Sequence, residues 1–328
     1  MHTCVLTRHT MFASGCTISY APHWRVRCNI LLLIMAGRRY RKGLPMELWI
    51  RIHMSYFSEG RFATISTRNE LVIYDLDTLS RVPLPHKIRG HVCCLAPRRD
   101  FVVVAAESTL RLVNMDTCKV TSSLPQARRI LNLLCSPTGT ELYTTSGYQI
   151  DKWDISDGLR FRSSATLGVA AIFVALNSIG RHLVACGWLG DIEVWDTAHE
   201  VICHRFSIPN SSFGVSECVL YDTYVFTSHH AGLLYRTDLS TLATDVVYKT
   251  NHSVLSCAVS RRLYVYMTDR TVTVVDRHTN ETVYELSGAR RLFCHCSFTP
   301  NELYLVIIRA QGRNLVWSVA GHLFRMTT

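Results

Sequence analysis

Two near-identical segments of the chain carry paired arginines, residues 127–131 (ARRIL) and residues 289–293 (ARRLF). A guanidinium group binds a carboxylate or a phosphate through two parallel, charge-assisted hydrogen bonds. If the fold brings these loops to one surface, they would form a site for an acidic or phosphorylated partner. The alternative is that the arginines are solvated and bond to neighbouring turns. The residues predicted to bind a partner are Arg89, Arg128, Arg129, Arg290 and Arg291.

Metal binding and catalysis have little support in the sequence. The nearest group to a metal site is Cys294-His295-Cys296, but on a strand the two cysteines point to one face and His295 to the other, so the three cannot chelate one ion. The sequence contains no Cys-x-x-Cys pair, nucleophile elbow, phosphate-binding loop or His-Glu-x-x-His motif. We therefore predict no catalytic residue, no metal and no cofactor.

The elements that must position the arginines recur along the chain. A strand of alternating apolar residues ends in an aromatic or apolar residue followed by Asp, most plainly in residues 150–154 (IDKWD) and 192–196 (IEVWD). Counted from Asp75, the steps between successive Asp residues are 41, 38, 42, 42 and 38, and Trp317-Ser318 follows after 42 more. Such a period indicates a repeat architecture. The Asp residues are Asp75, Asp116, Asp154, Asp196, Asp238 and Asp276.

Alternation and turn residues predict four strands in each repeat, and seven repeats fit the chain. A four-stranded sheet has two faces to bury and two edges to protect, and packing such sheets around an axis achieves both. The sequence is 48% hydrophobic, which is sufficient for such a core. Inner strands are predicted at residues 48–53, 92–96, 131–135, 171–176, 216–220, 254–259 and 292–298.

The spacing and the Trp-Asp dipeptides resemble the WD-repeat β-propeller family, over roughly residues 45–328. The resemblance implies an all-β fold, namely a seven-bladed propeller of four-stranded antiparallel blades. Trp153 and Trp195 would lie on third strands, packed between neighbouring sheets. Loops that enter inner strands, which include both arginine pairs, would lie on the top face, where the family usually docks its partners.

The family also has a structural lock, in which a His before the inner strand bonds to an Asp in the turn after the second strand. Two repeats match this pattern, His91 with Glu107 and His252 with Asp269. Only two Trp-Asp dipeptides are intact, so the repeats are diverged.

The net charge of +10 is unevenly distributed. Seven basic residues and no acidic residue fall before position 47, so the remainder is nearly neutral and no duplex nucleic acid is expected as a partner. We expect residues 1–44 to be a basic, disordered extension, whose run at 38–42 is either solvated or in contact with RNA, an acidic partner or a membrane surface. The apolar run at 29–35 is too short to span a bilayer.

Thirteen cysteines in a chain of this size do not indicate a disulfide framework. Predicted inner strands, where small apolar side chains fit, contain Cys93, Cys94, Cys135, Cys218, Cys257 and Cys296. We infer a reducing compartment, the cytoplasm or the nucleus.

The sequence as a whole predicts a non-catalytic scaffold that binds peptides or proteins on its top face, as a subunit of a larger complex. One alternative is an enzyme or small-ligand binder with a site at the channel mouth, since some propellers are enzymes. A second alternative is a substrate receptor of a ubiquitin ligase, because residues 44–48 with Ile50 and Ile52 look like the opening of an F-box. The same residues also fit the first inner strand.

Overall fold

A computed structural model of the chain describes residues 56–58, 61–66, 69–78, 80–96, 100–106, 109–126, 128–209, 214–287, 293–298, 302–309, 315–318 and 323–325. All regular secondary structure in these ranges is β-strand, which confirms the predicted all-β class. These ranges accordingly hold no helix with the length and apolar character needed to cross a membrane. The predicted extension at residues 1–44 lies outside the described residues.

The described strands form seven antiparallel sheets, each built from four strands that are consecutive in the chain. Sheet 1 contains β1 (Tyr56–Ser58), β2 (Arg61–Ile65), β3 (Leu71–Asp75) and β4 (Ser80–Val82), and sheet 2 contains β5 (Val92–Ala96), β6 (Phe101–Ala106), β7 (Thr109–Asn114) and β8 (Val120–Pro125). Sheet 3 contains β9 (Asn132–Cys135), β10 (Glu141–Ser146), β11 (Gln149–Asp154) and β12 (Arg160–Thr166), and sheet 4 contains β13 (Phe173–Leu176), β14 (His182–Cys186), β15 (Asp191–Asp196) and β16 (Val201–Ser207). Sheet 5 contains β17 (Val215–Tyr221), β18 (Tyr224–His229), β19 (Leu233–Asp238) and β20 (Thr244–Lys249), and sheet 6 contains β21 (Val254–Val259), β22 (Leu263–Thr268), β23 (Thr271–Asp276) and β24 (Thr282–Ser287). Sheet 7 contains β25 (Phe293–Phe298), β26 (Tyr304–Arg309), β27 (Leu315–Ser318) and β28 (Leu323–Arg325).

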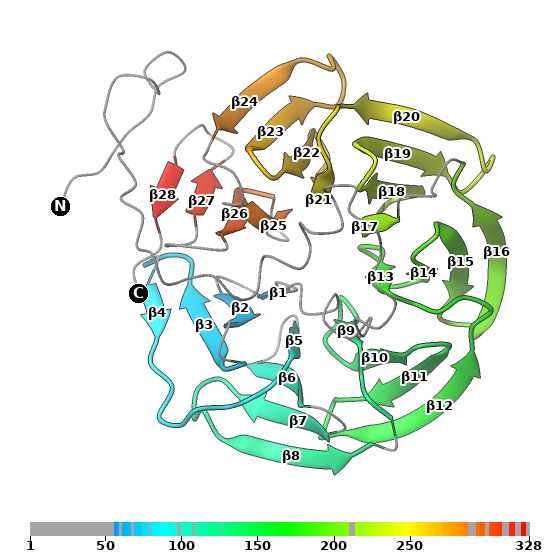
Figure 1. The fold of residues 1–328 in the computed structure, drawn as a ribbon. Helices are drawn as coiled ribbons and strands as arrows, with labels where there is room; N and C mark the ends of the chain where they lie inside the picture. The colour runs from blue at the N-terminus through cyan, green and yellow to red at the C-terminus, as the bar shows by residue number, and fades with distance from the viewer. Residues whose placement is uncertain are drawn as a thin grey trace, which may run out of the picture.

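The sheets are arranged around a common centre, as the blades of a propeller are (Figure 1). The strands β5, β9, β13, β17 and β21 lie toward the centre, and β8, β12, β16, β20 and β24 lie at the rim. Innermost strands of successive sheets are neighbours, β5 with β9, β9 with β13, and so on to β21 with β25. The prediction of a β-propeller with four-stranded antiparallel blades is therefore confirmed.

Two sets of turns define two faces of the propeller. In sheet 3, the connection to the next sheet bonds to the turn between the second and third strands, because the Ala171 N–H donates to the Gly147 carbonyl at 2.9 Å. We call the face that carries these connections and turns the top face. On the opposite, bottom face the Ile155 N–H donates to the Thr140 carbonyl at 2.8 Å, which joins the other two turns of the same sheet. Loops that enter inner strands thus share the top face with the turns between second and third strands.

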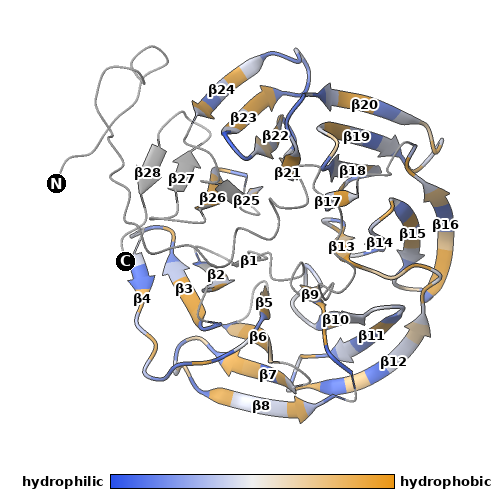
Figure 2. Cartoon of the chain, viewed as in Figure 1, coloured by the Kyte–Doolittle hydropathy of each residue, from blue (hydrophilic) through white to orange (hydrophobic). Residues whose placement is uncertain are grey.

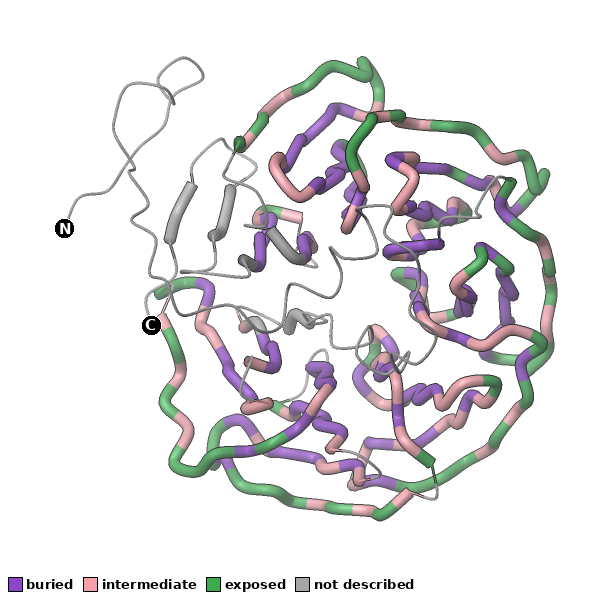
Figure 3. Tube along the Cα trace, viewed as in Figure 1, coloured by how far each residue is buried: buried purple, intermediate pink, exposed green. Residues whose placement is uncertain are grey.

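The core lies between adjacent sheets. Trp153 on β11 is 4% exposed and packs with Cys94 of sheet 2, and its Nε1–H donates to Thr144 Oγ1 at 3.1 Å. Trp195 on β15 packs with Tyr143 of sheet 3. Both tryptophans lie on third strands, where the sequence placed them. Buried residues concentrate toward the centre and exposed ones along the rim (Figure 3), while hydropathy alternates along rim strands such as β12 and β16 (Figure 2).

The recurring Asp closes the turn that follows the third strand in sheets 1, 3, 4, 5 and 6. Asp154 Oδ1 accepts a hydrogen bond from the Ser156 N–H at 2.8 Å, so the side chain stands in for a backbone acceptor. In sheet 2 this role belongs to Asn114, whose Oδ1 accepts from the Thr117 N–H at 2.8 Å. The expectation that Asp116 occupies the equivalent position is therefore wrong by two residues, because an amide oxygen can accept the same bond. The residues equivalent to Asp154 in other sheets are Asp75, Asp196, Asp238 and Asp276.

A β-bulge interrupts the pairing of the third and fourth strands in sheets 2 to 6, at the same place in sheets 2, 3, 4 and 6 and two residues earlier in the third strand of sheet 5. Bulges increase the local twist, which helps to prevent the exposed rim strands from pairing with another chain. The extra residues are Thr121, Arg162, Cys203, Val247 and Val283.

The innermost strand of sheet 1 differs from the prediction. Residues 56–58 pair with β2, beginning at Ser58 with Arg61, so only two residues separate the strands. In the sequence these two residues are Glu59-Gly60, and a glycine between two strand segments favours a tight hairpin turn. The segment expected there, 48–53, lies outside the described residues.

Candidate functional site

The structure places the predicted arginines on the top face where it describes them. Arg89 and Arg128 are exposed on the loops that enter β5 and β9, which are the innermost strands of adjacent sheets. Arg129 is half-buried beside Arg128. Arg290 and Arg291 lie outside the described residues. Two neighbouring top-face loops therefore present guanidinium groups to solvent.

The predicted locks differ from the family pattern. His91 Nε2 lies 2.6 Å from the carbonyl oxygen of Ile130, so this imidazole connects the loop entering β5 to the loop entering β9. Its expected partner, Glu107, lies outside the described residues. His252 is exposed, and its backbone N–H donates to Thr250 Oγ1 at 3.3 Å. In the described part of the chain no hydrogen bond joins His252 to its predicted partner Asp269, because the loop leaves the His252 ring at the surface.

Large apolar side chains lie exposed on the top face of sheets 3 and 4. Tyr148, in the turn between β10 and β11, is 59% exposed, and Leu189, in the turn between β14 and β15, is 57% exposed. Trp188 is half-buried beside Leu189, and its ring lies 5.5 Å from that of His230. Sequence reasoning missed these residues, although they occupy equivalent turns of two successive repeats.

The ring of Trp188 packs against Gly214, a position where only glycine fits. Gly214 has a φ of +83°, and a Cβ placed there would lie 2.4 Å from the Trp188 ring. The neighbouring His230 Nδ1 lies 3.0 Å from Ser253 Oγ, and burial lowers the pKa of His230 to about 4. The histidine is therefore neutral near pH 7, and the indole rests on an uncharged, fixed support.

Buried polar atoms without a hydrogen-bond partner gather at the top-face ends of inner and second strands. Asn132 begins β9 directly after the arginine loop, and its Nδ2 donates to Thr145 Oγ1 at 2.9 Å, but its Oδ1 has no partner among the described residues. Ser146 Oγ, at the end of the adjacent β10, also has none. Buried polar atoms of this kind usually bond to water or to a ligand. Sheet 3 therefore presents unused hydrogen-bonding capacity beside Arg128 and Tyr148.

A second polar cluster joins the inner strands of three successive sheets, at Glu217 on β17, Ser256 on β21 and His295 on β25. The Ser256 hydroxyl donates to Glu217 Oε2, and His295 Nδ1 lies 3.2 Å from Glu217 Oε1. The same nitrogen lies 3.3 Å from Ser256 Oγ. Because the Ser256 hydroxyl donates its proton to Glu217, Ser256 Oγ and Glu217 Oε1 both act as acceptors toward His295 Nδ1. His295 Nδ1 therefore carries a hydrogen atom.

This cluster connects sheets rather than resembling a nucleophilic relay. A relay needs the two nitrogens of the imidazole to face the serine and the carboxylate separately, whereas here one nitrogen faces both. Ser256 is also fully buried. The sequence signal was the spacing, since the three residues are 39 apart, and each directly follows a β-bulge in its strand.

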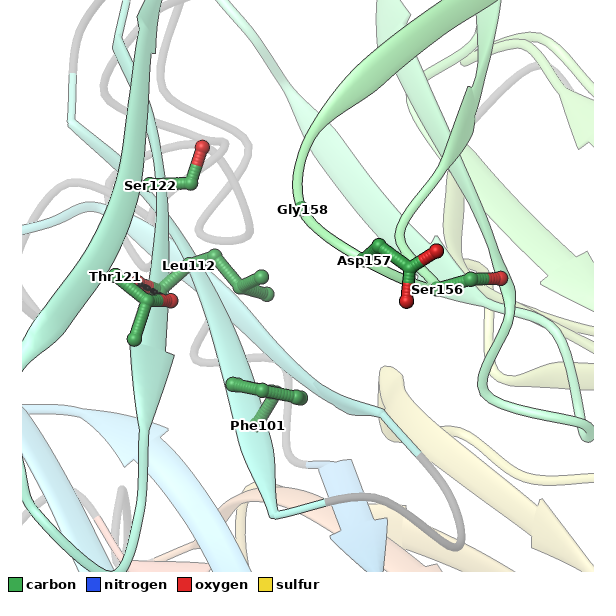
Figure 4. Close-up of a pocket in the computed structure, with 7 residues that line it drawn as sticks. All are labelled: Phe101, Leu112, Thr121, Ser122, Ser156, Asp157 and Gly158. Carbon is green, nitrogen blue, oxygen red and sulfur yellow. Dashed lines mark hydrogen bonds between the residues drawn. The ribbon is translucent and has the colours of Figure 1, made fainter.

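A pocket of about 450 Å³ lies on the bottom side, between sheets 2 and 3 (Figure 4). Phe101 and Leu112 form its apolar part, and the turn with Asp157 lies across from Thr121. It also contains Ser122, Ser156 and Gly158. Its one charged residue is Asp157, and none of the predicted arginines lines it.

Within the described residues, no three His, Cys, Asp or Glu side chains are placed to hold a metal ion. No protein-family model matches the chain, and no curated protein matches its sequence. The candidate functional site is therefore defined by geometry alone. It is the top face of sheets 3 and 4, with Arg128, Tyr148, Trp188 and Leu189, extended to Arg89 of sheet 2.

Proposed function

We propose that the protein is a non-catalytic interaction scaffold that binds acidic or phosphorylated segments of partner proteins on its top face. The observation that supports this proposal most directly is the exposure of Tyr148, Leu189 and Arg128 on turns and loops of two adjacent sheets. These turns are anchored by strand ladders and by bonds between the top-face connections, so they present a fixed surface.

The chemistry of this surface suits a protein segment. Tyrosine, tryptophan and arginine are enriched among the residues that contribute most to protein binding, because they bury large area and form directional bonds. Arg89 and Arg128 add positive charge at one side, which complements carboxylate or phosphate groups. Arg290 and Arg291 join this set on the basis of their sequence alone.

We also propose a family, a cellular compartment and a role in a complex for this scaffold. The seven sheets would be the seven blades of a closed ring of the WD-repeat type. The repeat period and the strands that end in Trp-Asp support this assignment. The cysteines whose side chains the structure describes are free thiols, which agrees with a place in the cytoplasm or the nucleus. A ring that displays loops without chemistry of its own would act as a subunit of a larger complex.

The proposal can be tested with two synthetic peptide pools, one with Asp, Glu or phosphoserine flanking Leu or Phe, and one with Lys in the acidic positions. We expect the acidic pool to bind the wild type more tightly. A variant carrying Arg128→Ala, Tyr148→Ala and Leu189→Ala should weaken that binding about tenfold or more, since each such residue contributes on the order of 1 kcal/mol.

The matched control uses the same sheets on other surfaces. Arg160 is exposed at the start of β12, and Ile179 is 73% exposed in the bottom-face turn after β13. Arg160→Ala combined with Ile179→Ala should leave peptide binding unchanged. Equal binding of the two pools, or equal loss in the control variant, would overturn the proposed site.

A further inference from the structure

Two cysteines meet across the joint between sheets 2 and 3. Cys94 on β5 and Cys135 on β9 have their Sγ atoms 3.1 Å apart, although the residues are 41 positions apart in the chain. A disulfide bond is about 2.05 Å long, so the sulfurs would need to approach by about 1 Å. Because β5 and β9 are neighbouring inner strands, this approach requires no rearrangement of the ring.

The two thiols differ in their surroundings. Cys94 is fully buried, and burial, followed by its contact with Cys135, raises the pKa of its thiol well above the usual value. Cys135 is partly exposed. Cys135 is therefore the more accessible of the two thiols to an oxidant. The buried Cys94 is in contact with Cys135 and can react with it in a second step.

We propose that Cys94 and Cys135 form a reversible, oxidant-responsive disulfide that ties sheet 2 to sheet 3. In the first step the Cys135 thiolate attacks a peroxide oxygen, the O–O bond breaks, and a sulfenic acid and hydroxide form. In the second step Cys94 gives up its proton and attacks the Cys135 sulfur, the S–O bond breaks, and hydroxide leaves and takes up a proton as water. The two thiols lose two electrons in total, and the peroxide gains them.

The position of this bond gives it a structural effect. Cys135 ends β9, and the loop that enters β9 carries Arg128. The same joint is already connected by the contact between His91 and the Ile130 carbonyl. A covalent bond between β5 and β9 would therefore hold β9, the strand that follows the Arg128 loop, against β5. This effect does not depend on whether the loop binds a partner.

A second thiol pair provides a comparison within the same molecule. Cys186 and Cys218, of sheets 4 and 5, are also in hydrogen-bond contact, and this contact is the largest cause of the raised pKa of Cys218. Both are buried, so peroxide has no partly exposed thiol to attack there. We expect this pair to oxidise more slowly than Cys94 and Cys135.

The test is to titrate the reduced, full-length protein with hydrogen peroxide and to map its tryptic peptides by mass spectrometry. We expect residues 90–98 and 130–152 to appear as one cross-linked species, lighter by two hydrogen atoms than the sum of the peptides and separated again by dithiothreitol. The melting temperature should rise by about 5 to 10 °C on oxidation, because the bond closes a long loop of the unfolded chain.

Cys93 provides a matched control, because it adjoins Cys94 in the chain but packs toward sheet 1. Cys93→Ser should keep the cross-link, and Cys94→Ser should abolish it. If Cys94→Ser does not fold, Cys135→Ser makes the same test from the partly exposed side. Absence of the cross-link at a peroxide concentration that oxidises the exposed Cys203, or its persistence in either of the last two variants, would overturn the proposal.

Discussion

Replacing Glu217 by Ala should destabilise the propeller, because its carboxylate is the shared acceptor of three inner-strand groups. Oε2 accepts from the Ser256 hydroxyl and, at 3.3 Å, from the Cys257 N–H, and Oε1 faces His295 Nδ1. In the variant the His295 N–H can still reach Ser256 Oγ, which leaves two buried donors without acceptors. At about 1 to 3 kcal/mol for each of the two unsatisfied groups, we expect a loss of about 2 to 6 kcal/mol.

For a domain of this size, about 2 °C of melting temperature corresponds to each kcal/mol, so the expected fall is about 4 to 12 °C by calorimetry. Glu285→Ala, on the exposed rim strand β24, is the control and should change stability by less than about 0.5 kcal/mol. The combination of Glu217→Ala with His295→Ala should cost less than the sum of the two single variants, since both remove the same contact. Strict additivity, or a Glu217 variant no less stable than the Glu285 variant, would refute the reasoning.

Three further predictions concern single sites. The backbone N–H of Ser156, followed by Arg162, lowers the pKa of Asp154 to about 2, below a value near 4 in the unfolded chain. The contribution of Asp154 to the free energy of unfolding should therefore be fully present above about pH 4 and decrease as the pH falls toward 2. Asp154→Asn should flatten that part of an acid-denaturation profile. His91→Ala should lower the free energy of unfolding by about 1 kcal/mol in urea titrations, whereas His252→Ala should leave it unchanged, and the reverse order would contradict the assigned contacts. Gly214→Ala should cost about 1 to 3 kcal/mol and alter the fluorescence of Trp188, because the added methyl meets the indole; an unchanged spectrum would contradict that contact.

The repeat period and strand alternation were sufficient to predict the class of fold. The inner strand β5 begins and ends at the predicted residues, 92 and 96, because it buries alternate residues against both neighbouring sheets, with Cys93 and Leu95 toward sheet 1 and Cys94 toward sheet 3. The first inner strand was misplaced because its apolar run, residues 48–53, had a stronger strand signal than Tyr56–Ser58. In the sequence, only the glycine of Glu59-Gly60 indicated the observed pairing of β1 with β2.

The candidate site was less accessible to sequence reasoning. The paired arginines can be recognised in the sequence by their residue types alone. The exposure of Tyr148 and Leu189 depends instead on how far each turn extends beyond its sheet, and no local sequence pattern predicts that distance. The contact of Cys94 with Cys135 and the cluster around Glu217 depend on side chains from different sheets. Their signal was a fixed step between equivalent positions of successive repeats, which becomes informative only when the inner strands are aligned with one another.

Every described sheet consists of four consecutive strands, and this has a consequence for the history and the assembly of the chain. Each ladder of backbone hydrogen bonds is local in sequence, so each repeat can form its hairpins without waiting for distant segments, which favours rapid folding. A break in a connection between two sheets would leave every ladder intact, which makes such connections suitable places to cut the chain in a circular permutant. A whole repeat could equally be duplicated or lost in evolution without leaving an orphan strand.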